Sequence, residues 1–117
     1  MTDLRTAIED LNNLVLAGQA FDAFDKYYAD DCVMQEDDQE PVHGKAANRA
    51  REEEFFNAVT EFRGAEVTAV AVGNGVTMVE WHFDYTHAEW GDMKYDQVAV
   101  QRWRDGQIVY ERFYKGM

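Results

Sequence analysis

The second half of the chain alternates apolar and polar residues with a period of two, and this pattern limits the fold more than any other feature. The alternating segments are Ala65 to Val72, Val76 to Ala88, Met93 to Trp103 and Gln107 to Tyr114. They are separated by the turn segments Gly73-Asn74-Gly75, Glu89 to Asp92 and Asp105-Gly106. Because a period of two is typical of strands and short turns join antiparallel neighbours, the pattern predicts a four-stranded antiparallel meander. Two of these strands are longer than usual, so we expect the sheet to curl.

The first half predicts three helices. Apolar residues recur at helical spacing over residues 4–15, residues 21–28 and Lys45 to Thr60. A short strand over 32–35 and an acidic loop, Glu36 to Gly44, are expected between the second and third helices. In the third helix the predicted inner residues are Ala47, Ala50, Phe55 and Val59, and the predicted exposed residues are Arg49, Arg51, Glu52 and Glu53. We therefore expect an α+β fold with three helices packed on a curved, mixed, mainly antiparallel β-sheet.

Composition narrows the possible partners and the compartment. The 117 residues predict a single domain spanning 1–117. A formal net charge of −12 disfavours nucleic acid and anionic membrane surfaces. Cys32 is the only cysteine, so no intramolecular disulfide and no Cys/His zinc site is expected. With no apolar leader or membrane-length segment in the sequence, we expect a cytoplasmic protein.

The strand over 76–88 has one aromatic face. That face carries Val79, Trp81, Phe83, Tyr85 and His87, while His82 and Asp84 lie on the other. The aromatic face must be buried against the helices, where it forms either a filled core or the lining of an internal pocket. We interpret His82 and Asp84 as solvated or dimer-interface residues rather than as a catalytic pair.

The last hairpin decides whether Glu111 faces the interior. A two-residue turn at Asp105-Gly106 sets Val100 opposite Glu111, whereas a three-residue loop with Gly106 as a bulge sets Ala99 opposite it. In the bulged register, Gln97, Ala99, Gln101 and Trp103 share a face with Val109, Glu111 and Phe113. Glu111 is then a carboxylate with a raised pKa, unless Arg102 or Arg112 pairs with it in a salt bridge.

Other patterns point to acid/base chemistry or to none. Glu36 directly follows a strand, and the acidic loop around it lacks the spacing and glycine of an EF-hand. The sequence has no Ser/His/Asp order, glycine-rich phosphate loop or HExxH motif. Hydrolase, nucleotide-binding and zinc-peptidase functions therefore have no support, and no metal or cofactor is expected.

The order of elements and three motifs resemble a known family. The motifs are Tyr28-Ala29-Asp30-Asp31 before the first strand, Glu40-Pro41-Val42-His43-Gly44 before the third helix and Trp103 to Val109 at the last turn. They are similar to the SnoaL-like branch of the nuclear-transport-factor-2-like superfamily, whose cystatin-like fold is a cone with an internal pocket. The resemblance covers essentially the full chain and supports the bulged register. It implies a homodimer formed through the sheet, and a function that ranges from isomerase, cyclase and dehydratase to non-enzymatic domains.

The resemblance also shows which catalytic groups this chain lacks. Glu36 matches the general-base aspartate of the ketosteroid isomerases, but Leu11 and Ala99 stand where those enzymes carry their two oxyanion donors. Ketosteroid isomerisation is therefore disfavoured. The polyketide cyclases carry a histidine and an aspartate at the positions of Glu111 and Phe113, so the acid of that pair is absent.

Two functions remain open. The first is a small-molecule acid/base isomerase, cyclase or dehydratase that acts on a small hydrophobic substrate through Glu36 or Glu111. The expected ligand-binding residues are Trp81, Phe83, Tyr85, His87, Gln97 and Phe113. The second is a non-catalytic ligand-binding module or a dimeric structural or interaction module. The sequence does not decide whether the chain is an enzyme.

Overall fold

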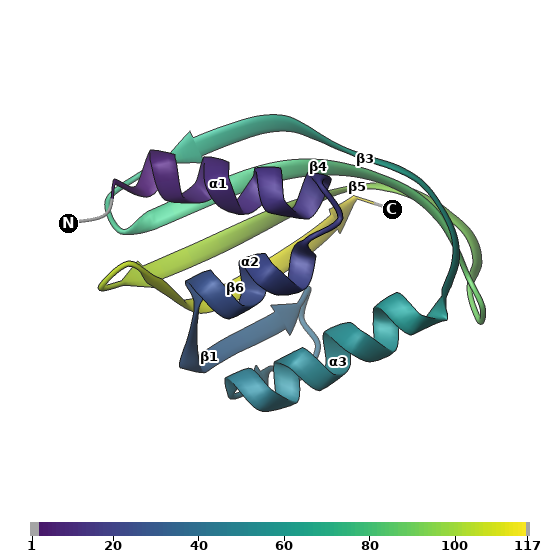
Figure 1. The fold of residues 1–117 in the computed structure, drawn as a ribbon, viewed down its shortest axis with the longest axis horizontal. Helices are drawn as coiled ribbons and strands as arrows, with labels where there is room; N and C mark the ends of the chain where they lie inside the picture. Colours follow the sequence, from purple (N-terminus) through teal and green to yellow (C-terminus); the bar gives the residue numbers. More distant parts are fainter. Residues whose placement is uncertain (1–2, 117) are drawn as a thin grey trace.

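Three helices and one six-stranded sheet make up the fold (Figure 1). The computed structural model describes residues 3–116. Its helices are α1 (Leu4–Leu16), α2 (Ala20–Tyr27) and α3 (Lys45–Ala58). Its strands are β1 (Tyr28–Glu36), β2 (Val42–His43), β3 (Val59–Val72), β4 (Val76–His87), β5 (Gly91–Arg104) and β6 (Gln107–Gly116). The α+β prediction is confirmed. None of the described helices has the length and apolar composition needed to cross a membrane.

The sheet is mixed, in the order β2-β1-β6-β5-β4-β3. Strands β3 to β6 form the predicted antiparallel meander, and β1 runs parallel to β6. Several element boundaries differ from the prediction. Strand β1 starts at Tyr28, within the expected second helix. The short strand β2 lies inside the segment expected to be an acidic loop, and β3 starts at Val59, within the expected third helix. The long antiparallel pairing of the edge strand β3 with β4 overrides the weak helical periodicity at the end of α3.

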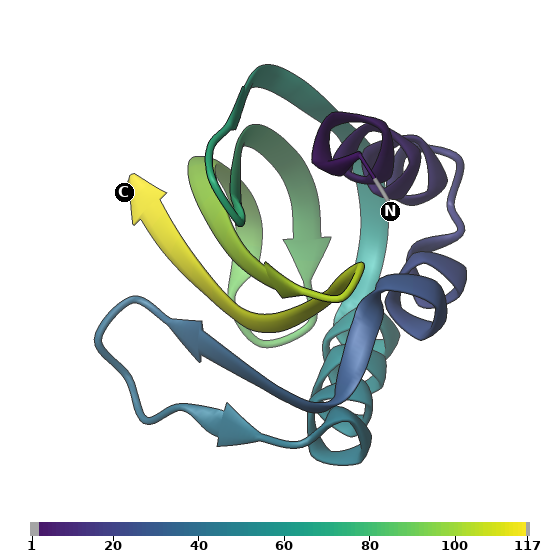
Figure 2. The same cartoon turned by 90° about the vertical axis from the view of Figure 1, so that its left-hand side faces the viewer.

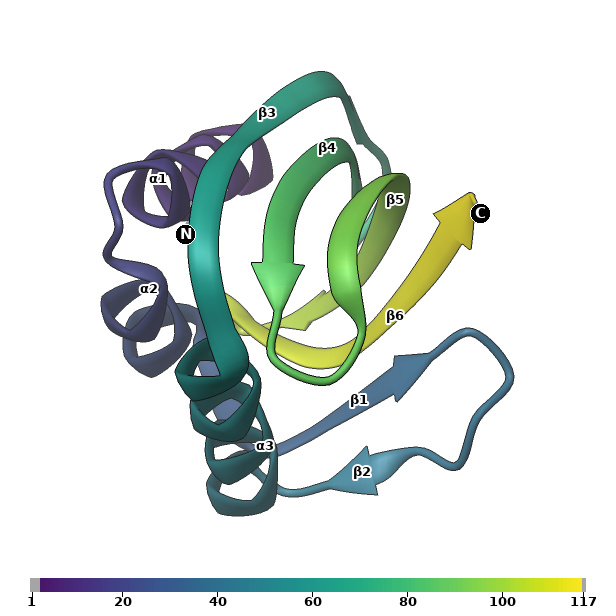
Figure 3. The same cartoon turned by 90° about the vertical axis from the view of Figure 1, so that its right-hand side faces the viewer.

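The sheet curls strongly, and all three helices lie on its concave side (Figures 2 and 3). The β3–β4 ladder contains three register shifts, and each such bulge increases the local twist. Ile8 of α1, Phe24 of α2, Val79 of β4 and Ile108 of β6 are buried in the core between the helices and the sheet. The curl and the helices therefore enclose one interior, and residues on the concave face of β4, β5 and β6 point into it.

The β5–β6 hairpin has a register that neither prediction described. Asp105 and Gly106 both have positive φ, 54° and 80°, as a two-residue type I′ turn requires. The register then shifts between Arg102 and Trp103, so that Gln101 lies opposite Glu111. Both predicted partners of Glu111 were therefore wrong, because the bulge lies beyond the turn rather than in it. Glu111 nevertheless faces the interior, since the true register differs from the predicted bulged one by two residues and keeps the same face.

Helix α3 presents only part of the predicted face to the interior. Phe55 packs on Tyr85 with ring centroids 5.4 Å apart, as expected of an inner residue. Asn48 is 0% exposed, whereas the expected inner residues Ala47 and Ala50 are exposed. The Asn48 amide Nδ2 donates to the carbonyl oxygens of Val42 and Gly44, each at 2.9 Å. These bonds connect α3 to β2. In the resulting orientation of the helix, Arg51 and Glu52 are half-buried, although both were predicted to be exposed. Hydrogen bonding, not apolar periodicity, sets the orientation of this helix.

The Asn48→Ala variant is expected to be less stable by about 1–3 kcal/mol, because buried carbonyl oxygens lose their side-chain donor. Urea unfolding measures the difference. Asn57→Ala is the matched control, since Asn57 is an exposed residue of the same helix. Equal loss of stability in the two variants would contradict the anchoring role of Asn48.

Candidate functional site

Glu111 lies on the concave face of β6 and is 3% exposed. Its neighbours across the sheet are Gln101 of β5 and Met34 of β1. The strand pairing therefore fixes the backbone of Glu111 on both sides, and its carboxyl group lies inside the cone. The interior position predicted for Glu111 is what the structure shows, and its catalytic role stays a prediction.

Two neutral donors bind the Glu111 carboxyl group. The Tyr28 hydroxyl donates to Oε1, and the Gln101 amide Nε2 donates to Oε2 at 2.7 Å. Within residues 3–116, Glu111 takes part in no ion pair. Arg112, one of the two predicted salt-bridge partners, instead donates from Nε to the carbonyl oxygen of Asp37 at 2.8 Å. The salt-bridge alternative for Glu111 was therefore wrong.

Burial raises the pKa of Glu111 to about 7. The hydrogen bonds from Tyr28 and Gln101 act in the opposite direction because they stabilise the carboxylate, and so does the positive charge of Arg51. The negative charge of Glu52 adds to the upward shift. A carboxyl group with this pKa is present in both protonation states near neutral pH, which is the condition that suits a group for either donating or accepting a proton.

The sequence analysis missed the role of Tyr28. It assigned this residue to the apolar face of the second helix, but α2 ends at Tyr27 and Tyr28 adopts extended backbone as the first residue of β1. Its ring stacks on Phe24 with centroids 4.7 Å apart, and its hydroxyl reaches Glu111. The signal that could have identified Tyr28 is its position at the change from helix to strand, where its side chain faces the sheet interior.

Glu36, the second predicted catalytic residue, lies at the end of β1, where two cations pair with it. Arg51 Nη1 is 3.4 Å from its Oε1, and Lys115 Nζ is 3.7 Å from its Oε2. Arg51 also contacts Glu52 on α3, at 3.5 Å. Glu36 and Glu111 therefore occupy different environments: Glu36 is half-buried in an ion-pair cluster, whereas Glu111 is enclosed among neutral groups.

A small pocket lies between α3 and the β1–β2 hairpin. It has a volume of about 90 Å³ and is lined by Met34, Glu36, Gln39, Glu40, Val42 and Arg51. Small-molecule sites usually measure about 300–1,000 Å³, so this pocket is below the usual range, and Glu111 is not part of its lining. Arg51 Nε is buried without an acceptor among the described residues.

The six predicted ligand-binding residues all lie on the concave side of the sheet. Trp81, Tyr85, His87 and Gln97 are buried, and Phe83 and Phe113 are half-buried. The rings of Trp81 and Phe83 stack with centroids 5.4 Å apart, and the hydroxyls of Tyr85 and Tyr95 are hydrogen-bonded at 2.7 Å. The six residues thus share the concave face of the sheet, and their role in binding a ligand stays a prediction.

His87 also supports the turn between β4 and β5. Its ring stacks on Trp90 with centroids 3.8 Å apart, and its Nδ1 accepts the backbone N–H of Glu89 at 3.1 Å. Because a backbone N–H can only donate, the neutral ring carries its proton on Nε2. Nδ1 is therefore occupied by its hydrogen bond to the turn, and Nε2–H is the donor that the ring can offer to another group.

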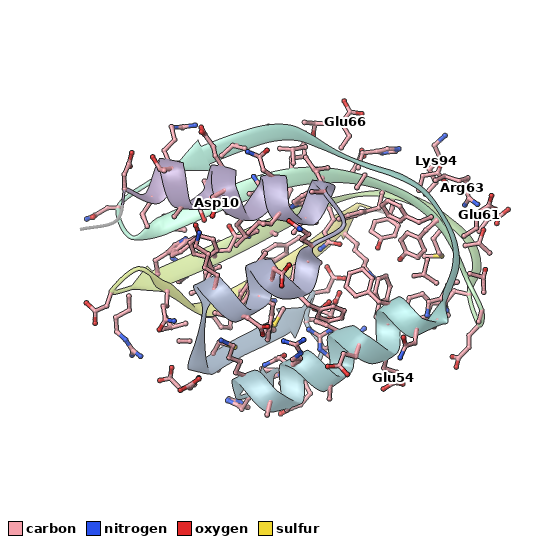
Figure 4. All side chains as sticks on the ribbon, viewed as in Figure 1. Asp10, Glu54, Glu61, Arg63, Glu66 and Lys94 are labelled. Atoms are coloured by element: carbon pink, nitrogen blue, oxygen red, sulfur yellow. The ribbon has the colours of Figure 1, made fainter. Side chains whose placement is uncertain are left out.

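His82 and Asp84 do not form a pair with each other. On the outer face of the sheet, His82 Nδ1 donates to Asp96 at 2.8 Å, and Asp84 accepts from Arg63 Nε at 2.7 Å. Figure 4 shows Arg63 near Lys94 at the outside of the curled sheet, away from the helices. The interpretation of His82 and Asp84 as surface or interface residues agrees with these contacts.

Sequence comparison matches residues 8–111 to the SnoaL-like domain. The chain belongs to the SnoaL-like domain family. A comparison of this SnoaL-like chain with curated proteins finds no match.

Solved structures extend the comparison. A protein from Mesorhizobium loti, provisionally named a SnoaL-like polyketide cyclase, is 26% identical over 97% of this chain and 99% of that one, with a TM-score of 0.88. A Xanthomonas campestris protein of unknown function with a cystatin-like fold is 11% identical over 99% and 92% of the two chains, with a TM-score of 0.86. AclR from Streptomyces galilaeus, provisionally named a hydroxylase, is 14% identical over 97% and 88%, with a TM-score of 0.76. These likenesses support the cystatin-like cone that the sequence motifs suggested.

Proposed function

We propose that this SnoaL-like protein is an acid/base enzyme of the isomerase, cyclase or dehydratase type, and that Glu111 exchanges a proton with a small, hydrophobic, neutral substrate. The observation that carries the proposal is the buried Glu111 carboxyl group, whose side-chain partners among residues 3–116 are the neutral donors Tyr28 and Gln101. The provisional names of the Mesorhizobium and Streptomyces relatives support an activity on small organic molecules. Reactions of these types commonly remove a proton from a carbon next to a carbonyl group.

Glu111 is a better candidate than Glu36 for proton transfer. Arg51 and Lys115 both lie within ion-pair distance of the Glu36 carboxylate, and such pairing stabilises the charged form. Burial of Glu111 instead destabilises its charged form and raises its pKa. In this proposal Glu36 and its two cations close the mouth of the cone, and the proton moves at Glu111.

Substrate entry requires the mouth to widen. The pocket beside Glu36 has a volume of about 90 Å³, which is too small for a typical substrate. Arg51 of α3 pairs with Glu36 of β1 and lines the pocket, so in this proposal movement of the Arg51 side chain enlarges the pocket toward the interior. The same small volume favours the second candidate function, a non-catalytic binding or structural module.

Proton exchange in D₂O separates the two candidates. The protein is incubated with a panel of small neutral ketones and conjugated enones, and mass spectrometry follows deuterium at the carbon next to the carbonyl. The acid/base proposal predicts incorporation above the buffer rate for at least one compound class. If every compound exchanges at the buffer rate, the acid/base function is wrong and the non-catalytic module remains.

We also propose a homodimer formed through the outer face of β4, β5 and β6. Met78 is 43% exposed and lies opposite the half-buried Val100, and Val98 lies opposite the exposed Tyr114. These residues form an apolar strip on an otherwise charged face. Covering such a strip with a second copy removes apolar surface from water.

The Met78→Glu variant is expected to shift the protein toward the monomer, because it places a charge in the apolar strip. Analytical ultracentrifugation measures the mass. Leu16→Glu is the matched control, since Leu16 is 47% exposed but lies on α1, away from the outer face. A wild-type monomer, or a Leu16→Glu variant that dissociates as much as Met78→Glu, would exclude this interface.

A further inference from the structure

The two oxygens of the Glu111 carboxyl group have different partners. Oε1 is bonded to the Tyr28 hydroxyl, which is able to donate or accept a hydrogen. Oε2 accepts from the Gln101 amide nitrogen Nε2 at 2.7 Å, and an amide nitrogen only donates. The site of protonation on this carboxyl group therefore depends on how the Gln101 amide is held.

A chain of hydrogen bonds holds the Gln101 amide in one orientation. It begins at the Trp103 indole Nε1–H, which only donates and binds Thr77 Oγ1 at 2.8 Å. The Thr77 hydroxyl donates its own hydrogen to Gln101 Oε1 at 2.6 Å. Gln101 Nε2 is then left to face Glu111. Thr77 and Gln101 are 0% and 1% exposed, so water does not compete for these bonds.

The direction of this chain decides where Glu111 carries a proton. A hydrogen on Oε2 would face the N–H of Gln101, and two donors facing each other in a buried site cost about as much as a lost hydrogen bond. A hydrogen on Oε1 meets the oxygen of Tyr28 instead. Tyr28 then accepts from Glu111, and its own hydroxyl hydrogen is released for another acceptor.

We propose that Trp103, Thr77 and Gln101 are positioning residues that confine the proton of Glu111 to Oε1, so that the Tyr28 hydroxyl is the group that touches the substrate and passes the proton on. The second part of this inference rests on the function proposed above. The substrate class that fits is a neutral molecule with a hydrogen-bond acceptor such as a carbonyl oxygen, because the released Tyr28 hydroxyl offers a donor without a charge.

The proton transfer balances without an ionised tyrosine. In the acid direction, the Glu111 Oε1–H bond breaks as Tyr28 Oη gains that proton, and the original Tyr28 O–H proton moves to the substrate oxygen. Glu111 ends as a carboxylate that accepts from Tyr28, and Tyr28 is neutral before and after. Burial and the charge of Glu111 hold the pKa of Tyr28 well above its usual value, so a lasting tyrosinate is disfavoured.

Other charged and titratable groups act on this pair only from a distance. The negative charges of Glu52 and Glu111 raise the pKa of Tyr28, and Arg51 of α3 lowers the pKa of Glu111. Cys32 of β1 also acts on Tyr28. Among the described residues, only Tyr28 and Gln101 bond to the carboxyl oxygens through side chains, so the directed chain remains the feature that distinguishes Oε1 from Oε2.

Titration of Glu111 tests the chain without any substrate. The carbonyl stretch of the protonated carboxyl group is followed by infrared difference spectroscopy between pH 4 and 9. Thr77→Val removes the hydroxyl at nearly constant shape, which lets the amide turn and weakens its bond to the carboxylate. The pKa of Glu111 is expected to rise by roughly 0.5–1 unit, about the effect of one neutral hydrogen bond. Trp103→Phe should shift it in the same direction by less.

Two control variants separate the hydroxyl from packing. Thr77→Ser restores the hydroxyl and should return the pKa to the wild-type value. Thr68→Val makes the same change at an exposed position of β3, whose hydroxyl binds Glu80, and should have no effect. A Thr77→Val variant that titrates like wild type, or a Thr77→Ser variant shifted as far as Thr77→Val, would overturn the directed chain.

Tyr28→Phe tests the delivery step in the deuterium exchange assay. This variant keeps the ring that stacks on Phe24 and removes the hydroxyl. It is expected to lose at least about tenfold in exchange rate, while Glu111 still titrates in the infrared. Wild-type exchange in Tyr28→Phe would overturn the role of Tyr28. If wild type itself shows no exchange, the proposed function fails and the role of Tyr28 fails with it, whereas the titrations still decide the chain.

Discussion

Glu111→Gln is expected to lower the rate of deuterium exchange into a responsive ketone by at least about 100-fold at pH 7. A positioned general acid or base contributes about 10²–10⁴-fold, and glutamine cannot take up or release the proton. The new amide can accept from Gln101 Nε2 through its oxygen and donate to the Tyr28 hydroxyl through its nitrogen, so the fold is expected to persist. Mass spectrometry of the exchanged ketone measures the rate, and circular dichroism confirms that the variant is folded.

Two further substitutions make this result specific. Glu54→Gln changes an exposed carboxylate on α3 (Figure 4) and is expected to exchange at the wild-type rate. Glu36→Gln is expected to reduce the rate by less than Glu111→Gln, because it removes the partner of Arg51 and Lys115 but leaves the interior carboxyl group in place. A larger loss in Glu36→Gln would transfer the acid/base role to Glu36.

The wild-type protein is expected to lose stability as the pH rises through about 7. The pKa of Glu111 is about 7 in the folded state and near the ordinary value of 4.5 in the unfolded chain. Between pH 4.5 and pH 7 the folded state therefore binds a proton that the unfolded chain does not. The contribution of this proton to the free energy of unfolding is fully present below pH 4.5 and is lost as the pH rises to about 7. From pH 5.5 to pH 8.5 this amounts to roughly 2 kcal/mol, at 1.4 kcal/mol per pKa unit.

Glu111→Gln isolates this contribution. Urea unfolding of both proteins gives the difference in free energy of unfolding between variant and wild type at pH 5.5 and at pH 8.5. From the lower to the higher pH, the variant should gain roughly 2 kcal/mol relative to wild type. Burial also raises the pKa of Glu52, and this residue contributes to the pH dependence in the same direction in both proteins. A difference between wild type and variant that does not change with pH would contradict the raised pKa of Glu111.

The sheet was predictable because its signal is local. Alternation with period two and a glycine-containing turn at Asp105-Gly106 are visible in the sequence, and strands β3 to β6 pair in chain order. The register was not predictable, since the bulge that sets Gln101 opposite Glu111 lies beyond the turn, where no turn residue marks it in the sequence. Glu111 was still assigned to the correct face, because only an odd shift in register turns a strand over.

The helix α3 shows where apolar periodicity fails. The weakly apolar Ala47 and Ala50 predicted which face of the helix packs against the interior. The hydrogen bonds of Asn48 instead place the face that carries Asn48 there. The sequence analysis consequently missed Arg51 and Glu52 as residues near the site. Tyr28 was missed for a related reason: its side chain reads as apolar in a helical pattern, and only the strand that begins there turns its hydroxyl toward Glu111.

The proposed function depends on one carboxyl group, that of Glu111, which is buried and half-protonated near neutral pH. Infrared difference spectroscopy, with Glu111→Gln subtracted from wild type, measures its titration directly. The structure predicts that the band of the protonated carboxyl group disappears with a midpoint at about pH 7. A midpoint near the ordinary glutamate value of 4.5 would contradict the proposed role, because Glu111 would then be a fully ionised carboxylate at neutral pH.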